Sequence, residues 1–192
     1  MECMRVIAGT AGRRRLKTLP GRATRPTADR VKESLFAILG GRVAAARFLD
    51  LFAGTGNIGI EALSRGAAQA VFVEANEPAV RIIRANLELT GFAAQAEVLR
   101  LDVSKAIAGL AGDGRQFDLI YLDPPYEAGR VLPTLQLVAR SGILAPGALL
   151  IAEHSRREDV PEAESAGIVL RRREKYGDTV LTFWHGAAER GN

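Results

Sequence analysis

Residues 49–59, with the sequence LDLFAGTGNIG, decide the fold, because they join an apolar run to a helical pattern through three glycines. These glycines, at positions 54, 56 and 59, have the spacing G-x-G-x-x-G. At this spacing, glycines let a tight turn between a strand and a helix pass close beneath a bulky ligand. The stretch therefore predicts the first strand, turn and helix of an α/β fold.

Apolar runs and helical patterns alternate through the rest of the chain. Strands are predicted near 48–52, 70–74, 96–101, 118–122, 147–152, 168–174 and 179–184, and helices near 57–65, 78–90, 103–110, 129–141 and 157–165. Such alternation is typical of a mainly parallel sheet with helices on both faces. Only residues 175–178 separate the last two strands, so these should pair as an antiparallel hairpin. We predict a Rossmann-like α/β fold with a seven-stranded, mostly parallel sheet and an antiparallel last strand.

The N-terminal segment differs from the rest of the chain in charge. Residues 1–32 hold nine Lys or Arg against two acidic side chains, although the whole chain has a net charge of only +4. A turn at 9–14 predicts a small hairpin, and Thr27 is expected to cap a helix that ends at Gly40. We expect residues 1–40 to form a basic hairpin and helix, and residues 41–192 to form the main domain.

Composition excludes several classes of protein. The chain is 47% hydrophobic and 25% charged, as folded globular proteins are. Its longest apolar stretch, 142–152, is interrupted by Pro146 and Gly147 and falls short of the roughly 20 residues that span a bilayer. The one cysteine, Cys3, excludes an intrachain disulfide and a Cys-cluster zinc site. We expect a cytoplasmic protein with no metal and no membrane partner.

Acidic residues at strand ends indicate which ligand the glycine turn holds. Glu74 ends the next strand, where a carboxylate can accept two ribose hydroxyls, and this feature suits NAD as well. Asp50 would face a pyrophosphate unfavourably but could meet the amino group of a methionine moiety. Asp102 could bind an adenine amino group or merely cap the next helix. S-adenosylmethionine is therefore favoured, with the cofactor-binding set Asp50, Phe52, Ala53, Gly54, Thr55, Gly56, Asn57, Gly59, Glu74, Asp102 and Val103.

The fourth predicted strand runs directly into DPPY at 123–126. Consecutive prolines fix φ and lack amide donors, so this turn presents carbonyl oxygens in a rigid frame. The carboxylate of Asp123 and the carbonyl of Pro124 can each accept one hydrogen of an exocyclic amine, which orients its lone pair. Tyr126 offers a flat face to a base. We interpret Asp123, Pro124, Pro125 and Tyr126 as a catalytic site for amine methylation, against the alternative of a proline-stiffened turn.

Together these motifs look like those of class I S-adenosylmethionine-dependent amino-methyltransferases. MRVIAG at 4–9, RPTADRVKE at 25–33, LDLFAGTG at 49–56 and GIEALSRG at 59–66 narrow the likeness, because they are similar to bacterial 16S rRNA (guanine-N2)-methyltransferases of the RsmD type. The resemblance implies methyl transfer to N2 of G966 of 16S rRNA in the small ribosomal subunit. We also expect a monomer and contacts with ribosomal proteins.

The resemblance assigns the basic segment to RNA binding, because Lys and Arg neutralise phosphates. The expected RNA-facing set is Arg5, Arg13, Arg14, Arg15, Lys17, Arg22, Arg25, Thr27, Arg30 and Lys32. A solvated charged face is the simpler alternative. The function also stays open to a DNA adenine-N6 or protein glutamine methyltransferase, an NAD-linked oxidoreductase, or a non-catalytic ribosome-assembly factor.

Overall fold

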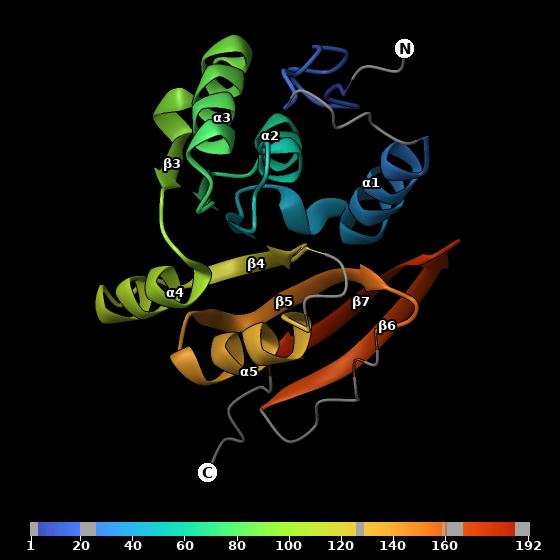
Figure 1. Cartoon of the computed structure of the whole chain (residues 1–192), viewed down its shortest axis with the longest axis vertical. Coiled ribbons are helices and arrows are strands. Elements are labelled where there is room, and N and C mark those ends of the chain that lie inside the picture. The colour runs from blue at the N-terminus through green and yellow to red at the C-terminus, as the bar shows by residue number, and fades with distance from the viewer. Residues whose placement is uncertain (1–3, 20–25, 126–128, 159, 161–166, 187–192) are drawn as a thin grey trace.

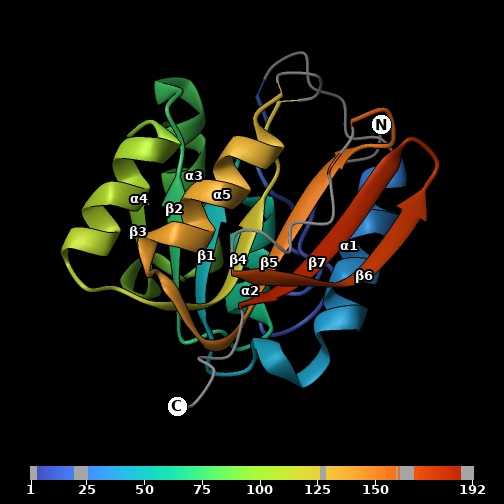
Figure 2. The ribbon, with the colours of Figure 1, turned by 90° about the horizontal axis from the view of Figure 1, so that it is seen from below.

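The computed structural model describes residues 4–19, 26–125, 129–158, 160 and 167–186, and a sheet runs through this part of the chain. Its strands are β1 (Arg47–Leu51), β2 (Gln69–Val73), β3 (Ala96–Leu99), β4 (Phe117–Leu122), β5 (Leu144–Ser155), β6 (Ile168–Tyr176) and β7 (Thr179–Gly186). They lie in the order β3-β2-β1-β4-β5-β7-β6, which Figure 2 shows from one edge to the other. The five strands from β3 to β5 in this order are parallel, and β7 is antiparallel to both of its neighbours.

The strand pattern confirms the predicted fold class and the predicted hairpin of β6 and β7. One difference is the length of β5, which was predicted near 147–152 but begins at Leu144, before Pro146, and continues to Ser155. Here the pairing shifts, since Phe117 lies opposite Leu144 but Leu119 lies opposite Leu149. A bulge of this kind places a proline and a glycine in a strand without a regular ladder bond.

Helices cover both faces of the sheet (Figure 1). They are α1 (Pro26–Leu39), α2 (Asn57–Ser64), α3 (Glu77–Thr90), α4 (Val103–Gly112) and α5 (Val131–Ser141), with short 3-10 turns η1 (Gly40–Val43) and η2 (Ala93–Gln95). α1, α2 and α3 lie on one face, and α4 and α5 on the other. Thr27 lies inside the first turn of α1 rather than at its cap, because the helix begins with Pro26, which suits a first helical position. The helix predicted at 157–165 lies mostly outside the described residues.

Alternate residues of the central strands form two hydrophobic clusters, one on each face. Phe48 and Tyr121 face α1, α2 and α3, whereas Leu49 and Ile120 face α4 and α5. Each fully buried large apolar side chain stabilises the fold by about 1.5–3 kcal/mol. Both faces of the sheet are therefore covered by apolar packing, so a polar functional site is expected at the ends of the strands. No helix in the described ranges is long and apolar enough to cross a membrane.

The N-terminal segment folds back on itself and packs on α2 and α3. The Val6 N–H donates to the Arg14 carbonyl, and the Arg13 N–H donates to the Val6 carbonyl, which confirms a small hairpin around the 9–14 turn. Gly9 has a φ of +85°, and a Cβ there would lie 1.8 Å from the carbonyl oxygen of Ser64. Only glycine allows this close approach, which seats the hairpin on the end of α2.

Candidate active site

The glycine turn joins the C-terminal end of β1 to α2. Phe52, Gly54 and Gly56 all have positive φ values, of 62°, 57° and 80°, so the chain reverses within a few residues. The glycines differ in what they approach. A Cβ at Gly59 would lie 2.3 Å from the ring of Phe72, so Gly59 lets α2 pack against β2. No atom lies within 4 Å of a Cβ built on Gly54, so this part of the turn faces open space.

Asp50 lies beneath this turn, where it is almost fully buried. One of its carboxylate oxygens accepts the N–H of Gly59 at 2.9 Å. Burial raises the pKa of Asp50 to about 7, with a smaller rise from nearby Glu74, while the bond from Gly59 lowers it. A cationic ammonium group placed beside this carboxyl would favour its ionised form. The site therefore suits the amino group of a methionine moiety.

Glu74 holds the other side of the turn from the end of β2. Its two carboxylate oxygens accept the N–H groups of Gly54, at 2.9 Å, and of Asn76, at 2.8 Å. A carboxylate oxygen can accept more than one hydrogen bond, so these contacts leave acceptor capacity for hydroxyl groups. The arrangement orients Glu74 beside the open space at Gly54, where it could accept hydroxyl groups.

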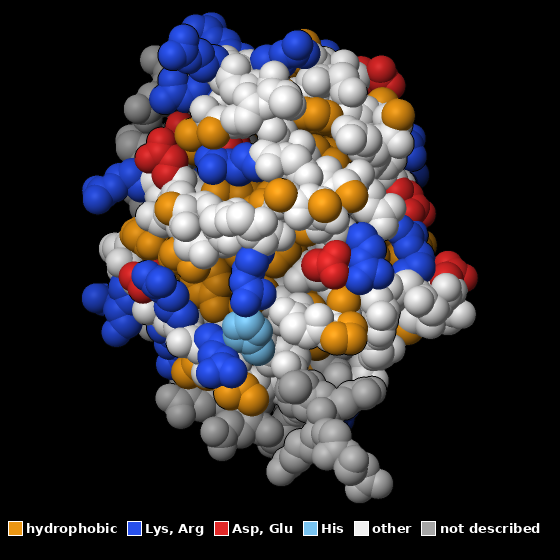
Figure 3. Space-filling view, turned by 180° about the vertical axis from the view of Figure 1, so that it is seen from behind, with side chains coloured by type: hydrophobic (Ala, Val, Ile, Leu, Met, Phe, Trp, Pro, Cys, Tyr) orange, Lys and Arg blue, Asp and Glu red, His pale blue; other side chains and the backbone are white. Residues whose placement is uncertain are grey.

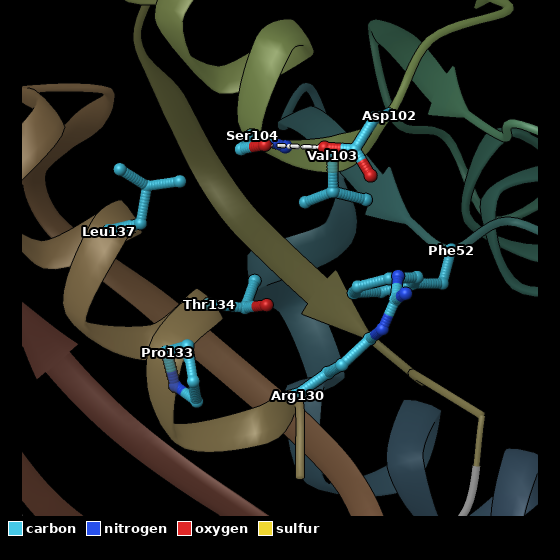
Figure 4. Close-up of a pocket in the computed structure, with 8 residues that line it drawn as sticks. All are labelled: Phe52, Asp102, Val103, Ser104, Arg130, Pro133, Thr134 and Leu137. Carbon is cyan, nitrogen blue, oxygen red and sulfur yellow. Dashed lines mark hydrogen bonds between the residues drawn. The ribbon is translucent and has the colours of Figure 1, made fainter. Parts of the chain in front are cut away.

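A pocket of about 270 Å³ opens next to the turn (Figure 4). Its lining is Phe52, Asp102, Val103, Ser104, Arg130, Pro133, Thr134 and Leu137. Asp102 caps α4 by accepting the N–H of Ser104 at 2.9 Å, and it also accepts the Ser104 hydroxyl. The hydroxyl bond, followed by the backbone bond, lowers the pKa of Asp102. The Arg130 side chain extends from the start of α5 toward the Phe52 ring. Phe52, Asp102 and Val103 were predicted from the sequence, whereas the lining from α5 carries no motif that marks it.

The proline turn follows β4, directly beside the end of β1. The two strands are paired with Asp50 opposite Tyr121, and the N–H of Asp123 donates to the carbonyl of Leu51 at 3.4 Å. Asp123 is half-buried, Pro124 is buried and Pro125 is exposed. Tyr126 lies outside the described residues. Asp123 thus lies next to the glycine turn, at the edge of the sheet where open α/β folds bind ligands.

A further pair of polar side chains lies at the same edge and was not predicted. The buried Tyr121 hydroxyl donates to a carboxylate oxygen of Glu153 at 2.6 Å. Burial and the neighbouring carboxylates raise the pKa of Tyr121 well above its usual value, so the hydroxyl keeps its proton. Neither residue belongs to a recognisable motif.

The exposed part of the N-terminal segment is basic. Arg5, Arg13, Arg14, Arg15, Lys17 and Arg30 are all exposed. Figure 3 shows Lys and Arg side chains gathered at the end of the molecule that carries this segment. Arg14 is held in place by a 2.6 Å bond to the carbonyl of Leu89 in α3. Arg22 and Arg25 lie outside the described residues, and Thr27 is described only as part of α1.

Lys32 is a correction to the expected RNA-facing set. It is 1% exposed, and its ammonium group donates to the carbonyl of Arg5 at 2.6 Å and to the side-chain oxygen of Asn57 at 2.7 Å. It also lies 3.5 Å from the carboxylate of Glu61. The prediction for Lys32 is wrong because a buried, paired ammonium group cannot reach a phosphate. The bond from Lys32 to Asn57 also occupies the side-chain oxygen of Asn57, a residue that was expected to contact the cofactor.

The hairpin and the glycine turn share a buried side chain. Asn86 of α3 is fully buried, and its amide oxygen accepts the N–H of Lys17 at 2.8 Å. Its amide nitrogen donates to the carbonyls of Lys17, at 3.1 Å, and of Thr55, at 3.0 Å. The Thr55 hydroxyl also donates to the sulfur of Met4 at 3.3 Å. These contacts join the basic segment to the turn that would hold the cofactor.

A family model described as "Conserved hypothetical protein 95" matches residues 4–185, which include the hairpin, the glycine turn and the proline turn. The chain belongs to this family. Within the described ranges, no group of three or more His, Cys, Asp or Glu side chains could hold a metal ion.

Other proteins similar to this chain have a named activity. The Bacillus subtilis protein YlbH, a candidate rRNA methyltransferase, is 39% identical over 181 residues, or 94% of this chain and 98% of YlbH. Ribosomal RNA small subunit methyltransferase D of Escherichia coli K12 is 35% identical over 158 residues, or 82% of this chain and 78% of that protein. The solved structure of the Escherichia coli methyltransferase candidate yhhF has a TM-score of 0.84 at 30% identity, covering 98% of this chain and all of that one.

These likenesses extend over most of each chain, so the family assignment applies to the whole fold. The chain is a methyltransferase, and it groups with the small subunit methyltransferase D proteins. In this protein, the glycine turn and the proline turn follow the neighbouring strands β1 and β4.

Proposed function

We propose that this methyltransferase uses S-adenosylmethionine to methylate N2 of a guanine in 16S rRNA of the small ribosomal subunit, G966 by family resemblance. The observation that carries the proposal is the contact between Asp123 and Leu51, which puts a rigid acceptor turn beside the glycine turn. The Escherichia coli and Haemophilus influenzae relatives are named as small subunit rRNA methyltransferases, which supports this choice of RNA. We place the reaction in the cytoplasm and expect a monomeric enzyme.

Several residues of the glycine turn and pocket fit the proposed cofactor. Asp50 would bind its amino group, Glu74 its ribose hydroxyls, and the pocket at Phe52, Asp102 and Val103 its adenine. When bound, S-adenosylmethionine supplies an electrophilic methyl group on a sulfonium sulfur. The remaining task of the protein is to bring an amine into line with that methyl group, and such alignment is a large source of rate enhancement.

Asp123 and Pro124 would align the amine. The carboxylate of Asp123 and the carbonyl of Pro124 accept one N–H each, so the nitrogen lone pair points away from them. So held, the amine would be set to attack the methyl group that the cofactor would supply, with the electron pair of the broken carbon–sulfur bond remaining on sulfur. The proton lost from N2 passes to Asp123 or to water. A stacked and paired guanine cannot reach this turn, so the base has to be unpaired or extruded.

The proposed function is tested with labelled S-adenosylmethionine and small ribosomal subunits from a strain that lacks the enzyme. We expect label at the N2 of a single guanine, located by mapping the modified nucleotide. Subunits that already carry the methyl group serve as the control and should take up no label. Label on another base, or none in a preparation that binds S-adenosylhomocysteine, would overturn the proposed substrate.

Residues 1–40 would form the RNA-facing part, and their exposed arginines provide a second test. The double substitution Arg13→Glu and Arg15→Glu should weaken binding to small subunits and flatten its dependence on salt. The slope of log K against log salt should fall by about one for each phosphate that the variant no longer neutralises. Arg171→Glu with Arg172→Glu, on the exposed edge strand β6, makes the same change in charge elsewhere. An equal effect of both pairs would mean that only net charge matters, and the hairpin would then have no specific role.

A further inference from the structure

Glu153 lies next to Asp123 at the C-terminal edge of the sheet. In the parallel pairing of β4 and β5, Tyr121 is opposite Ile151 and Leu122 is opposite Ala152. Asp123 directly follows Leu122 and Glu153 directly follows Ala152, so each carboxylate comes next after the last paired residues of two neighbouring strands. Figure 2 shows these strands side by side in the middle of the sheet. Residues two apart on a strand share a face, so Glu153 lies on the same face as Ile151 and Tyr121.

Tyr121 holds Glu153 in this position. The tyrosine is 2% exposed, and its hydroxyl donates to one Glu153 oxygen at 2.6 Å. Burial raises the pKa of this tyrosine most, and the negative charges of Glu153 and Asp123 raise it further. Glu153 itself is half-buried, at the border between the core and the strand end. A carboxylate has about four acceptor positions, so the bond from Tyr121 leaves it able to accept another donor.

We propose that Glu153 determines specificity for guanine by accepting the N1–H of the target base. This inference rests on the proposed function and deepens it. On the Watson–Crick edge of guanine, the N1–H donor is adjacent to the N2 amino group. If Asp123 and Pro124 hold that amino group, the acceptor on the neighbouring strand meets N1–H. Two adjacent carboxylates therefore match two adjacent donors.

The same arrangement rejects the other bases that carry an exocyclic amine. In adenine and cytosine, the ring nitrogen next to the amino group is an acceptor with a lone pair and no hydrogen. That lone pair would face the Glu153 carboxylate, so two acceptors would oppose and repel each other. A site built to bind a donor discriminates strongly against an analogue that presents an acceptor at the same place. Glu153 thus favours guanine N2 over adenine N6 at a turn whose chemistry suits both.

The test combines two changes: the RNA loses the N1–H donor of the target base, and the enzyme loses the Glu153 carboxylate that would accept it. Small subunits are reconstituted with 16S rRNA that carries guanine or 2-aminopurine at the target position. 2-Aminopurine keeps the amine at C2 but has a bare N1 acceptor. The unmodified enzyme should methylate guanine about ten- to a hundredfold faster, as expected for a hydrogen bond to a charged group. In Glu153→Gln, the amide can donate to that bare N1, so the preference should fall to less than about threefold.

Two further variants separate recognition from a general effect. Glu174→Gln removes a carboxylate from β6, in a residue paired with Arg172 and away from Asp123, and should keep the guanine preference of the unmodified enzyme. Tyr121→Phe removes the hydroxyl that orients Glu153 and should slow guanine methylation with little change for 2-aminopurine. An unchanged preference in Glu153→Gln would overturn the role of Glu153 and leave the proposed function intact. Failure of the unmodified enzyme to methylate guanine would overturn the proposed function, and this inference with it.

Discussion

Asp123→Asn should reduce methyl transfer by about a thousandfold or more, while the affinity for S-adenosylhomocysteine changes by less than about threefold. The amide has nearly the shape of the carboxylate, so the turn and its backbone bond to Leu51 should persist. However, it carries no charge to stabilise the amine as positive charge develops on nitrogen, and one of its two groups is a donor that would face the amine hydrogens. Single-turnover kinetics and calorimetric titration measure the two quantities separately.

Asp118→Asn is the matched control for that variant. Asp118 lies near the start of the same strand and pairs with the half-exposed Arg47 at 2.9 Å. It lies at the opposite end of β4 from Asp123, so its loss should leave turnover unchanged. Near-normal turnover in Asp123→Asn would remove Asp123 from the reaction. An equal loss of S-adenosylhomocysteine binding would instead assign it to the cofactor.

Glu61→Ala should lower the free energy of unfolding by about 3–5 kcal/mol, because it leaves a buried positive charge without its partner. Glu61 is fully buried and accepts the N–H groups of Ile7, at 2.7 Å, and Ala8, at 3.0 Å. It also pairs with Lys32 and with Arg65. Burial already lowers the pKa of Lys32, and the charge of Glu61 is the largest opposing influence. Denaturant titration at neutral pH measures the loss.

Glu77→Ala provides the comparison for a solvent-exposed carboxylate. Glu77 forms two exposed pairs, with Arg81 and with Arg100, each at 3.0 Å. Exposed ion pairs contribute from nothing to about 1 kcal/mol each, so the loss of both pairs should cost no more than about 2 kcal/mol. Similar losses in Glu61→Ala and Glu77→Ala would show that the cluster around Lys32 does not hold the N-terminal hairpin.

The parts of the site that could be predicted from the sequence are those that local pattern specifies. The glycine spacing, the acidic residue at the end of β2 and the DPPY turn each follow an apolar run, and parallel strands place such ends at one edge of the sheet. The strand count and the final hairpin followed from the same periodicity. The third glycine of the pattern, Gly59, also has a structural reason, because no larger residue fits there against Phe72.

The parts that could not be predicted depend on contacts between distant segments. Lys32 stands in a run of basic residues, and nothing in that run shows that Glu61 lies buried beside it. Glu153 is a single acidic residue at the end of an apolar run. A role for Glu153 can be inferred only once β5 is known to pair with β4 and the Tyr121 hydroxyl is known to bond to Glu153. The surroundings of Lys32 and of Glu153 are formed by residues distant in the sequence, so composition and periodicity could not predict them.

Asn86 makes the hairpin and the glycine turn one cooperative unit. One buried amide satisfies backbone groups of Lys17 and Thr55, so either segment can move away only by leaving polar groups of the other unpaired. Local opening of one should therefore carry most of the free-energy cost of opening both. A nucleic acid that orders the hairpin would then stabilise the glycine turn and raise the affinity for a cofactor bound there. A bound cofactor would raise the affinity for the nucleic acid by the same factor, since thermodynamic linkage is reciprocal.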